Sequence, residues 1–399
     1  MSEMIDAKPN KIGAQFGMVG GALLIGGGAL SAMGLSGGFD VNTFAPSFML
    51  GAMFWIMMSM GCMGLMLLFH VTRGRWGTPL LRVFEAGASP INLAFCFALV
   101  MVAWFVFKIP LYEMWINVEP TDMIILNKQA YLNETAWVIR QPIYFAILIA
   151  LSWRLMSWTR LEEKTGDKKY NDYRNNLAAP GILIFILVMT FFITDFLMSI
   201  DAHWFSTVWG FLFTVGSALS AMSLAVAVVV ANKDKAPFAG KVDNLMTKDF
   251  GNLLLMLTML WAYLSFSQML IIWSGNLKEF IPYYLKRIVG GYSTLGTILV
   301  IMQFFGPFLL LLSPKLKRTS WLLVPTALLI FGVRFVEMFW LVMPYFRKTL
   351  TVMPADIGML CLIGGIWFLI SSFGMRGAAL VVDAHPYQHA DLKEASAHV

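Results

Sequence analysis

The feature that most constrains this chain is a series of long apolar segments, each long enough to cross a lipid bilayer. The hydrocarbon core of a bilayer is about 30 Å thick, so a spanning helix needs roughly 20 mostly apolar residues. Ten segments meet this requirement: 12–34, 44–70, 88–107, 140–157, 180–200, 204–231, 250–274, 291–313, 319–342 and 355–375. The first is longer than the apolar part of a signal peptide, and no cleavage site of the A-x-A type follows it. We therefore predict an all-α, polytopic membrane protein with ten transmembrane helices.

The charge content excludes several other classes of protein. Only 13% of the residues are charged and 58% are hydrophobic, whereas soluble domains average about 25% charged residues. So few charges cannot cover the surface of a soluble domain of 399 residues. This excludes a cytosolic enzyme, a disordered chain and a nucleic-acid-binding module, and lipid must contact most of the surface.

The basic residues predict the orientation in the membrane. Of the 29 Lys and Arg residues, nineteen lie on the side of both termini and seven on the other side. The nineteen include those in the loops 71–87, 158–179, 232–249 and 314–318. Because loops rich in Lys and Arg stay in the cytoplasm, we expect both termini and these four loops to be cytoplasmic.

Two patterns concern how the spans pack. Gly13, Gly17 and Gly21 recur every four residues, which predicts a close helix contact, either within the chain or with a partner subunit. The outer segments 110–115 and 276–284 are both polar and aromatic, which suggests that the two halves repeat. We predict two four-helix bundles, in residues 44–203 and 204–343. A flanking helix in residues 1–43 and a second in residues 344–399, with a cytoplasmic tail, complete the chain.

The cysteines and histidines predict that the chain holds no redox centre or metal of its own. Cys62, Cys96 and Cys361 lie far apart in apolar segments, and no C-x-x-C motif is present. No two histidines face each other within the membrane, so a haem would lack axial ligands. The five are His70, His203, His385, His389 and His398. The spacing of His385 and His389 suits a metal on a helix, but Pro386 between them argues against one.

Polar residues inside or at the ends of the spans are the candidate functional residues, because burying them in lipid is costly. The densest group ends the fifth span and comprises Asp195, Ser199, Asp201 and His203. Asp195 lies in the apolar run, where desolvation favours the neutral carboxyl. It is therefore a proton carrier or a quinone-facing residue, or else a structural hydrogen-bonding group. For Asp201 the simplest interpretation is that it, or Ser206, caps the sixth span.

Three further pairs are candidates for a proton path, each with a structural alternative. Arg334 and Glu337 are three residues apart on one helix and predict a buried ion pair. Tyr263 and Gln268 line a polar seam or bond to neighbouring helices. His70 and Glu85, among Arg73, Arg75 and Arg82, form a proton entry point or lie at the interface.

Several of these segments resemble the NrfD/PsrC-like membrane subunits of alternative complex III. The run Asp195-Phe-Leu-Met-Ser-Ile-Asp-Ala-His-Trp-Phe-Ser-Thr207 resembles their D-W-x-M-S-L-D-P-H-W-F-S-T segment. Residues 261–279 resemble their W-x-Y-x-x-F-S-Q-x-L-I-I-W-Y-x-N-L-P-E-E segment, and Arg75-Trp-Gly and Tyr131-Leu-Asn with Arg140 also fit. Ala202, Lys278 and Phe280 depart from the family pattern. In length the chain is more like the shorter of the two ten-helix subunits, the ActF type.

The resemblance implies a cofactor-free subunit of a quinol-oxidising complex in the bacterial inner membrane. Its implied partners are a multihaem cytochrome with c-type haems, an iron–sulfur protein, a homologous ten-helix subunit and lipids. Quinol oxidation is placed mainly at the homologous subunit, and ActF-type subunits are proposed to contribute a proton path. The residues alone leave two rivals open: a stand-alone secondary transporter, whose site would be built from broken helices at the midplane, and a purely structural scaffold.

Overall fold

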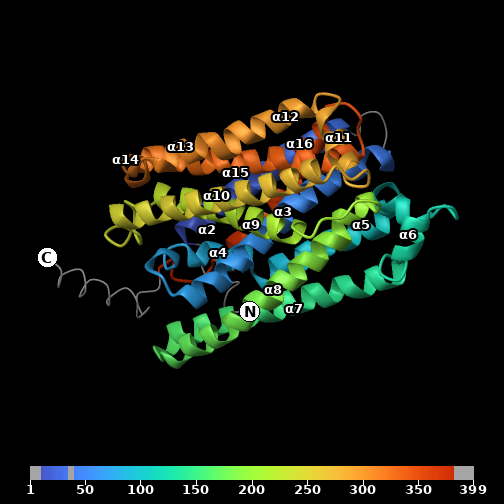
Figure 1. Cartoon of the computed structure of the whole chain (residues 1–399). Coiled ribbons are helices and arrows are strands. Elements are labelled where there is room, and N and C mark those ends of the chain that lie inside the picture. Colours follow the sequence, from blue (N-terminus) through green and yellow to red (C-terminus); the bar gives the residue numbers. More distant parts are fainter. Residues whose placement is uncertain (1–9, 35–39, 382–399) are drawn as a thin grey trace.

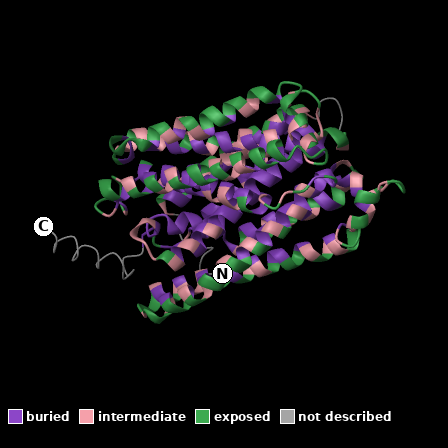
Figure 2. Cartoon of the chain, viewed as in Figure 1, coloured by how far each residue is buried: buried purple, intermediate pink, exposed green. Residues whose placement is uncertain are grey.

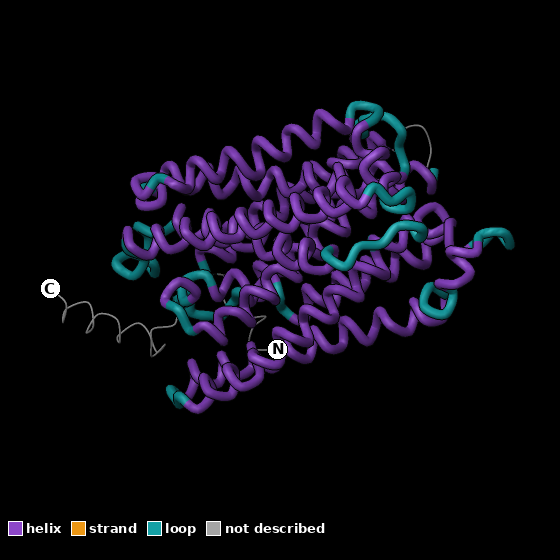
Figure 3. The backbone as a smooth tube through the Cα atoms, viewed as in Figure 1, coloured by secondary structure: helices purple, strands orange, loops and turns teal. Residues whose placement is uncertain are grey.

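The computed structural model describes residues 10–34 and 40–381, and throughout this part of the chain all regular structure is helical (Figures 1 and 3). Ten helices are long and apolar enough to cross a membrane, which confirms the predicted fold class. The spans are α2 (Lys11–Gly34), α3 (Val41–Thr72), α4 (Leu81–Gly87) with α5 (Pro90–Ile116), α7 (Glu134–Thr165), α8 (Lys169–Phe196), α9 (Trp209–Ala231), α10 (Asn244–Gly275), α12 (Tyr292–Leu299) with α13 (Gly306–Leu312), α15 (Ser320–Val342) and α16 (Pro354–Gly374). A π-helical turn, Val300–Phe305, joins α12 to α13.

Short helices connect the spans. They are α6 (Met123–Lys128), α11 (Ile281–Ile288), α14 (Pro314–Arg318) and the 3₁₀ turns η1 (Arg75–Gly77), η2 (Met198–Asp201) and η4 (Met343–Tyr345). Side chains of Asp40, Ser89, Asn133 and Asp243 cap the first turns of α3, α5, α7 and α10. The polar residues before each of these apolar runs therefore decide where the helix begins.

The spans pack as two four-helix bundles with a flanking pair. In the first bundle α3, α5, α7 and α8 contact one another in a closed ring, and α9, α10, α12 with α13, and α15 do the same in the second. Helices α3 and α9 join the two bundles and are the most buried spans, as Figure 2 shows. Helix α16 packs against α3 and carries α2 on its other side. The exact bundle boundaries at residues 43, 203 and 343 stay predictions.

The contact between α2 and α16 depends on glycines, but not on all of those predicted. A Cβ atom added at Gly27 would lie 2.4 Å from the Leu362 amide nitrogen, and one at Gly20 would lie 2.9 Å from the Gly365 oxygen. At Gly21 nothing lies within 4 Å, so its place in the predicted contact was wrong. Gly13 and Gly17 do face α16, because added Cβ atoms would lie 3.4 Å and 3.3 Å from the Ser372 carbonyl and hydroxyl oxygens. The tightest contacts, at Gly20 and Gly27, are seven residues apart, and the neighbouring helix belongs to the same chain.

The basic loops gather at one end of the molecule. The turn between α7 and α8, the loop between α9 and α10, and α14 lie at the left in Figure 1, whereas α6 and α11 lie at the right. We call these the basic end and the opposite end. Successive loops therefore lie at alternate ends of the molecule, as the predicted topology requires. That the basic end is cytoplasmic stays a prediction, and residues 1–9 and 382–399 lie outside the described part.

Candidate functional site: buried charges along the membrane

Asp195 is the most deeply buried of the predicted site residues and is fully enclosed near the end of α8. Arg140 on α7 donates a hydrogen bond to each carboxylate oxygen, from Nε to Oδ2 at 2.8 Å and from Nη2 to Oδ1 at 3.0 Å. The Tyr144 hydroxyl donates to Oδ2 at 3.0 Å, and Gln141 Nε2 lies 3.4 Å from it. Paired charges and several donors offset the cost of burying an anion. The structure therefore makes Asp195 the ion-pair partner of Arg140.

The ion pair with Arg140 was not predicted from the sequence. Sequence reasoning placed Arg140 at the edge of a span and did not connect it with Asp195, which lies 55 positions later. The sequence feature that pointed to Arg140 was the segment from Tyr131 to Arg140. In the structure the Arg140 guanidinium lies 4.0 Å from the centre of the Tyr131 ring and donates to the Tyr131 carbonyl oxygen. Burial and the nearby Asp195 charge raise the pKa of Tyr131, so its hydroxyl stays protonated.

Ser199 lies in η2, four residues after Asp195. Its hydroxyl donates to the Asp195 carbonyl oxygen at 2.6 Å, and Trp137 Nε1 donates to the same oxygen at 2.9 Å. Both bonds go to one of the last carbonyl oxygens of α8, where the chain tightens into η2. They fix the position of Asp195 relative to the residues that follow it.

Asp201 does not cap the sixth span, so that interpretation was wrong. It ends η2 and accepts a hydrogen bond from Lys286 Nζ of α11 at 2.7 Å. Helix α9 begins later, at Trp209, and no side chain caps it. Ser206 is not a cap either, because its hydroxyl donates to Gln268 Oε1 at 2.9 Å. The Asp201 carboxylate binds Lys286 of α11 instead of the first amides of α9.

His203 lies at the surface of the opposite end, with 42% of its side chain exposed. Its Nε2 atom is 2.6 Å from Oδ2 of Asp122, which also caps α6. Burial acts to raise the pKa of Asp122, but hydrogen bonds from the Ile125 amide and His203 outweigh it, so the pKa is lowered. His203 and Asp122 therefore tie the η2 segment to α6.

The two candidate residues on α10, Gln268 and Tyr263, lie in different surroundings. Gln268 is buried and lines an apolar cavity of about 220 Å³ together with Ser206, Phe205 and Phe280. Tyr263 points away from it, with 66% of its surface exposed on the outside of the bundle. The predicted polar seam therefore does not include Tyr263.

Arg334 and Glu337 form the predicted ion pair inside the second bundle. Both are buried; Trp261 Nε1 donates to Glu337 at 2.8 Å, and Arg334 Nε donates to the Ser220 hydroxyl at 3.2 Å. Room for the guanidinium comes from Gly216, where an added Cβ would lie 2.2 Å from Arg334 Nη2. The pair links α15 to both α9 and α10.

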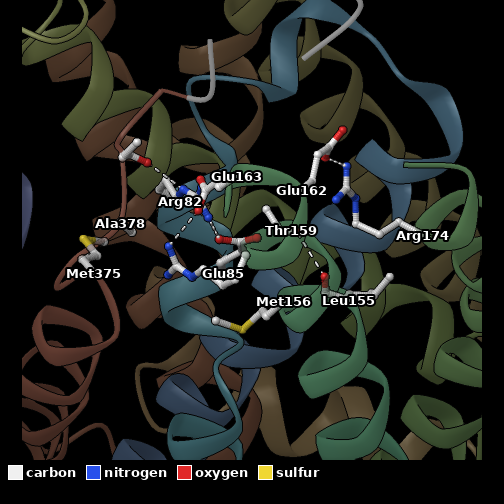
Figure 4. Close-up of polar contacts among 12 residues, drawn as sticks. Arg82, Glu85, Leu155, Met156, Thr159, Glu162, Glu163, Arg174, Met375 and Ala378 are labelled. Atoms are coloured by element: carbon white, nitrogen blue, oxygen red, sulfur yellow. Dashed lines mark hydrogen bonds and ion pairs between the residues drawn. The ribbon is translucent and has the colours of Figure 1, made fainter. Parts of the chain in front are cut away.

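At the basic end, Glu85 forms a buried ion pair with Arg82, three residues earlier on α4. Figure 4 shows Arg82 between Glu85 and Glu163. A second pair joins Glu162, the residue before Glu163 on α7, to Arg174 on α8. Sequence reasoning missed the residues that α7 and α8 contribute. They are Arg160, Glu162, Glu163 and Arg174. His70 is buried near the end of α3.

Within the described residues, no group of three or more His, Cys, Asp or Glu side chains is placed to hold a metal ion. The possible pair His385 and His389, with His398, lies outside the described residues. The sequence matches no known family model, and comparison with curated proteins gives no match. The resemblance to alternative complex III subunits therefore stays an expectation.

Proposed function

We propose that this chain is an integral membrane subunit of a quinol-oxidising electron-transfer complex of the alternative complex III type. In this proposal it supplies a route for protons to the opposite end and anchors partner subunits that carry c-type haems and iron–sulfur clusters. Those partners, the homologous ten-helix subunit and quinol come from the family resemblance. The membrane is then the bacterial inner membrane, with both termini in the cytoplasm.

The observation that carries the proposal is the succession of polar groups from Asp195 to the surface. Asp195 and Arg140 lie within an apolar bundle, where paired charges do not add much stability and are often retained for function. Ser199, Asp201 with Lys286, and His203 with Asp122 follow in order toward the opposite end. Each of these side chains can accept a proton, or bind a water molecule that carries one, when its present hydrogen bond opens.

In this mechanism Arg140 and the Asp195 carboxylate separate transiently, and the carboxylate then accepts a proton. When the pair closes again, the proton leaves toward Asp201 and His203. Tyr144 holds the carboxylate in place throughout by its hydrogen bond. The Arg334–Glu337 pair and the Arg82–Glu85 pair are the further charged steps toward the basic end.

The test is proton release by the assembled complex in vesicles. Asparagine at position 195 keeps the shape of the side chain but cannot carry a proton. The Arg140 side chain that it leaves unpaired is 19% exposed and can reach water, so Asp195→Asn should assemble and lower proton release per electron. Tyr263→Phe is the matched control, because its hydroxyl lies outside the cluster, and it should leave proton release unchanged. Unchanged release and turnover in Asp195→Asn would show that Asp195 is only structural.

A further inference from the structure

At the basic end, a cavity of about 420 Å³ lies between η1 and the first turns of α10. Its lining residues are Arg75, Trp76, Asp249, Asn252 and Leu253. None of them belongs to the buried ion pairs described above. The segment Arg75-Trp-Gly stood out in the sequence, yet the proposed proton route gives it no role.

The cavity presents charges of opposite sign. The Arg75 guanidinium lies beside Asp243, with Nη2 3.8 Å from Asp243 Oδ2, and the Asp249 side chain is exposed. Lys317 adds a second cation behind Asn252, whose Oδ1 accepts from Lys317 Nζ at 2.7 Å. Burial lowers the pKa of Lys317, but the side chain stays a hydrogen-bond donor. The cavity therefore offers cations and a carboxylate to one small ligand.

The remaining lining residues are those of a membrane interface. Trp76 is an amphipathic ring of the type enriched at the headgroup level, and Gly74 leaves room for it. The exposed side chains of Met256 and Leu260 follow Leu253 on the same face of α10, three and seven residues later. An apolar strip thus leads from the cavity toward the middle of the membrane.

We propose that this cavity binds the headgroup of a zwitterionic phospholipid with a primary ammonium group, of the phosphatidylethanolamine type. The phosphate lies against Arg75 and the ammonium against Asp249, while an acyl chain follows Leu253, Met256 and Leu260. A guanidinium is the side chain that best matches a phosphate, and a carboxylate pairs with an ammonium that has N–H donors. Choline has no such donors, and the Asp249 carboxylate disfavours a headgroup that carries only negative charge.

The test is lipid binding to the full chain, delipidated in detergent and observed by native mass spectrometry. We expect phosphatidylethanolamine to bind about tenfold more tightly than phosphatidylglycerol or phosphatidylcholine, the equivalent of one charge-assisted hydrogen bond. Asp249→Asn should remove the preference over phosphatidylglycerol, and Arg75→Gln should weaken both lipids. Asp234→Asn and Lys235→Gln, in the neighbouring loop between α9 and α10, are the matched controls and should bind as the unaltered chain does.

Three results would overturn the proposal: equal binding of the three lipids, a preference that survives Asp249→Asn, or displacement of the lipid by inorganic phosphate alone, which would identify a free-anion site. Arg75→Lys and Asp249→Glu retain the charges and should retain the preference. They keep the test decisive if a charge-removing variant fails to fold.

Discussion

Replacing Arg140 by glutamine should destabilise the first bundle strongly, because it leaves the Asp195 carboxylate buried without its cation. At 2.8 Å and an effective dielectric constant of about 20, two unit charges attract each other by about 6 kcal/mol. Desolvation offsets part of this, and removing one partner of a buried pair costs about 3–5 kcal/mol. We expect a loss of that size in the free energy of unfolding of Arg140→Gln.

The same reasoning predicts that a second substitution restores stability. In Arg140→Gln/Asp195→Asn no charge remains buried, so the double variant should be more stable than Arg140→Gln, with a coupling energy of about 2 kcal/mol. The assay is denaturant unfolding of the full chain in mixed micelles. Lys108→Gln is the control, because its pair with Glu134 also joins α5 to α7 but is exposed, and it should cost less than about 1 kcal/mol.

Additive effects of the two substitutions would refute this reasoning. They would show that Arg140 and Asp195 do not depend on each other, and that the carboxylate is stabilised mainly by Tyr144 and Gln141. A loss in Lys108→Gln as large as that in Arg140→Gln would also refute it, because burial would then make no difference.

Three further predictions follow from the packing and the surface groups. Gly27→Leu should disrupt the contact of α2 with α16 and lower the thermal midpoint, whereas Gly21→Leu should not, since nothing lies within 4 Å of it; equal midpoints would contradict the heptad contact. Gly216→Val should displace the Arg334 guanidinium and destabilise the second bundle by about 1–3 kcal/mol in denaturant unfolding; no loss would mean that Arg334 has room to move. The lowered pKa of Asp122 means that its bonds stabilise α6 fully above about pH 3.9 and are lost as the pH falls through the lowered value, so hydrogen exchange in α6 should accelerate only below about pH 4; acceleration that begins near pH 6 would contradict this.

The overall architecture was predictable because spanning a bilayer leaves a strong signal in each segment separately. Ten apolar runs, each of about one membrane thickness, and the distribution of Lys and Arg required no knowledge of which helices touch. The pair Arg334 and Glu337 was predictable for the same reason, since both residues lie on one turn of α15.

Contacts between helices were not predictable in the same way. Arg140 and Asp195 face each other only because α7 and α8 run antiparallel, and Arg82 reaches Glu163 only because α4 lies beside α7. The prediction for Asp201 failed because its partner, Lys286, is 85 positions away on α11. The sequence did not indicate which part of the chain α11 would contact. Only Gly21 was misplaced in the glycine contact, because a four-residue spacing and a seven-residue spacing share part of one helix face.

The central claim is that this chain works as a subunit of a redox complex. The most direct measurement is purification of the tagged chain from its own membranes in a mild detergent, followed by identification of the chains that accompany it and a visible absorption spectrum. We predict a multihaem cytochrome and an iron–sulfur protein in constant ratio to this chain, with a haem spectrum that is lost when these partners are removed. A monodisperse chain without such partners would contradict the account and would favour a stand-alone transporter or a structural scaffold.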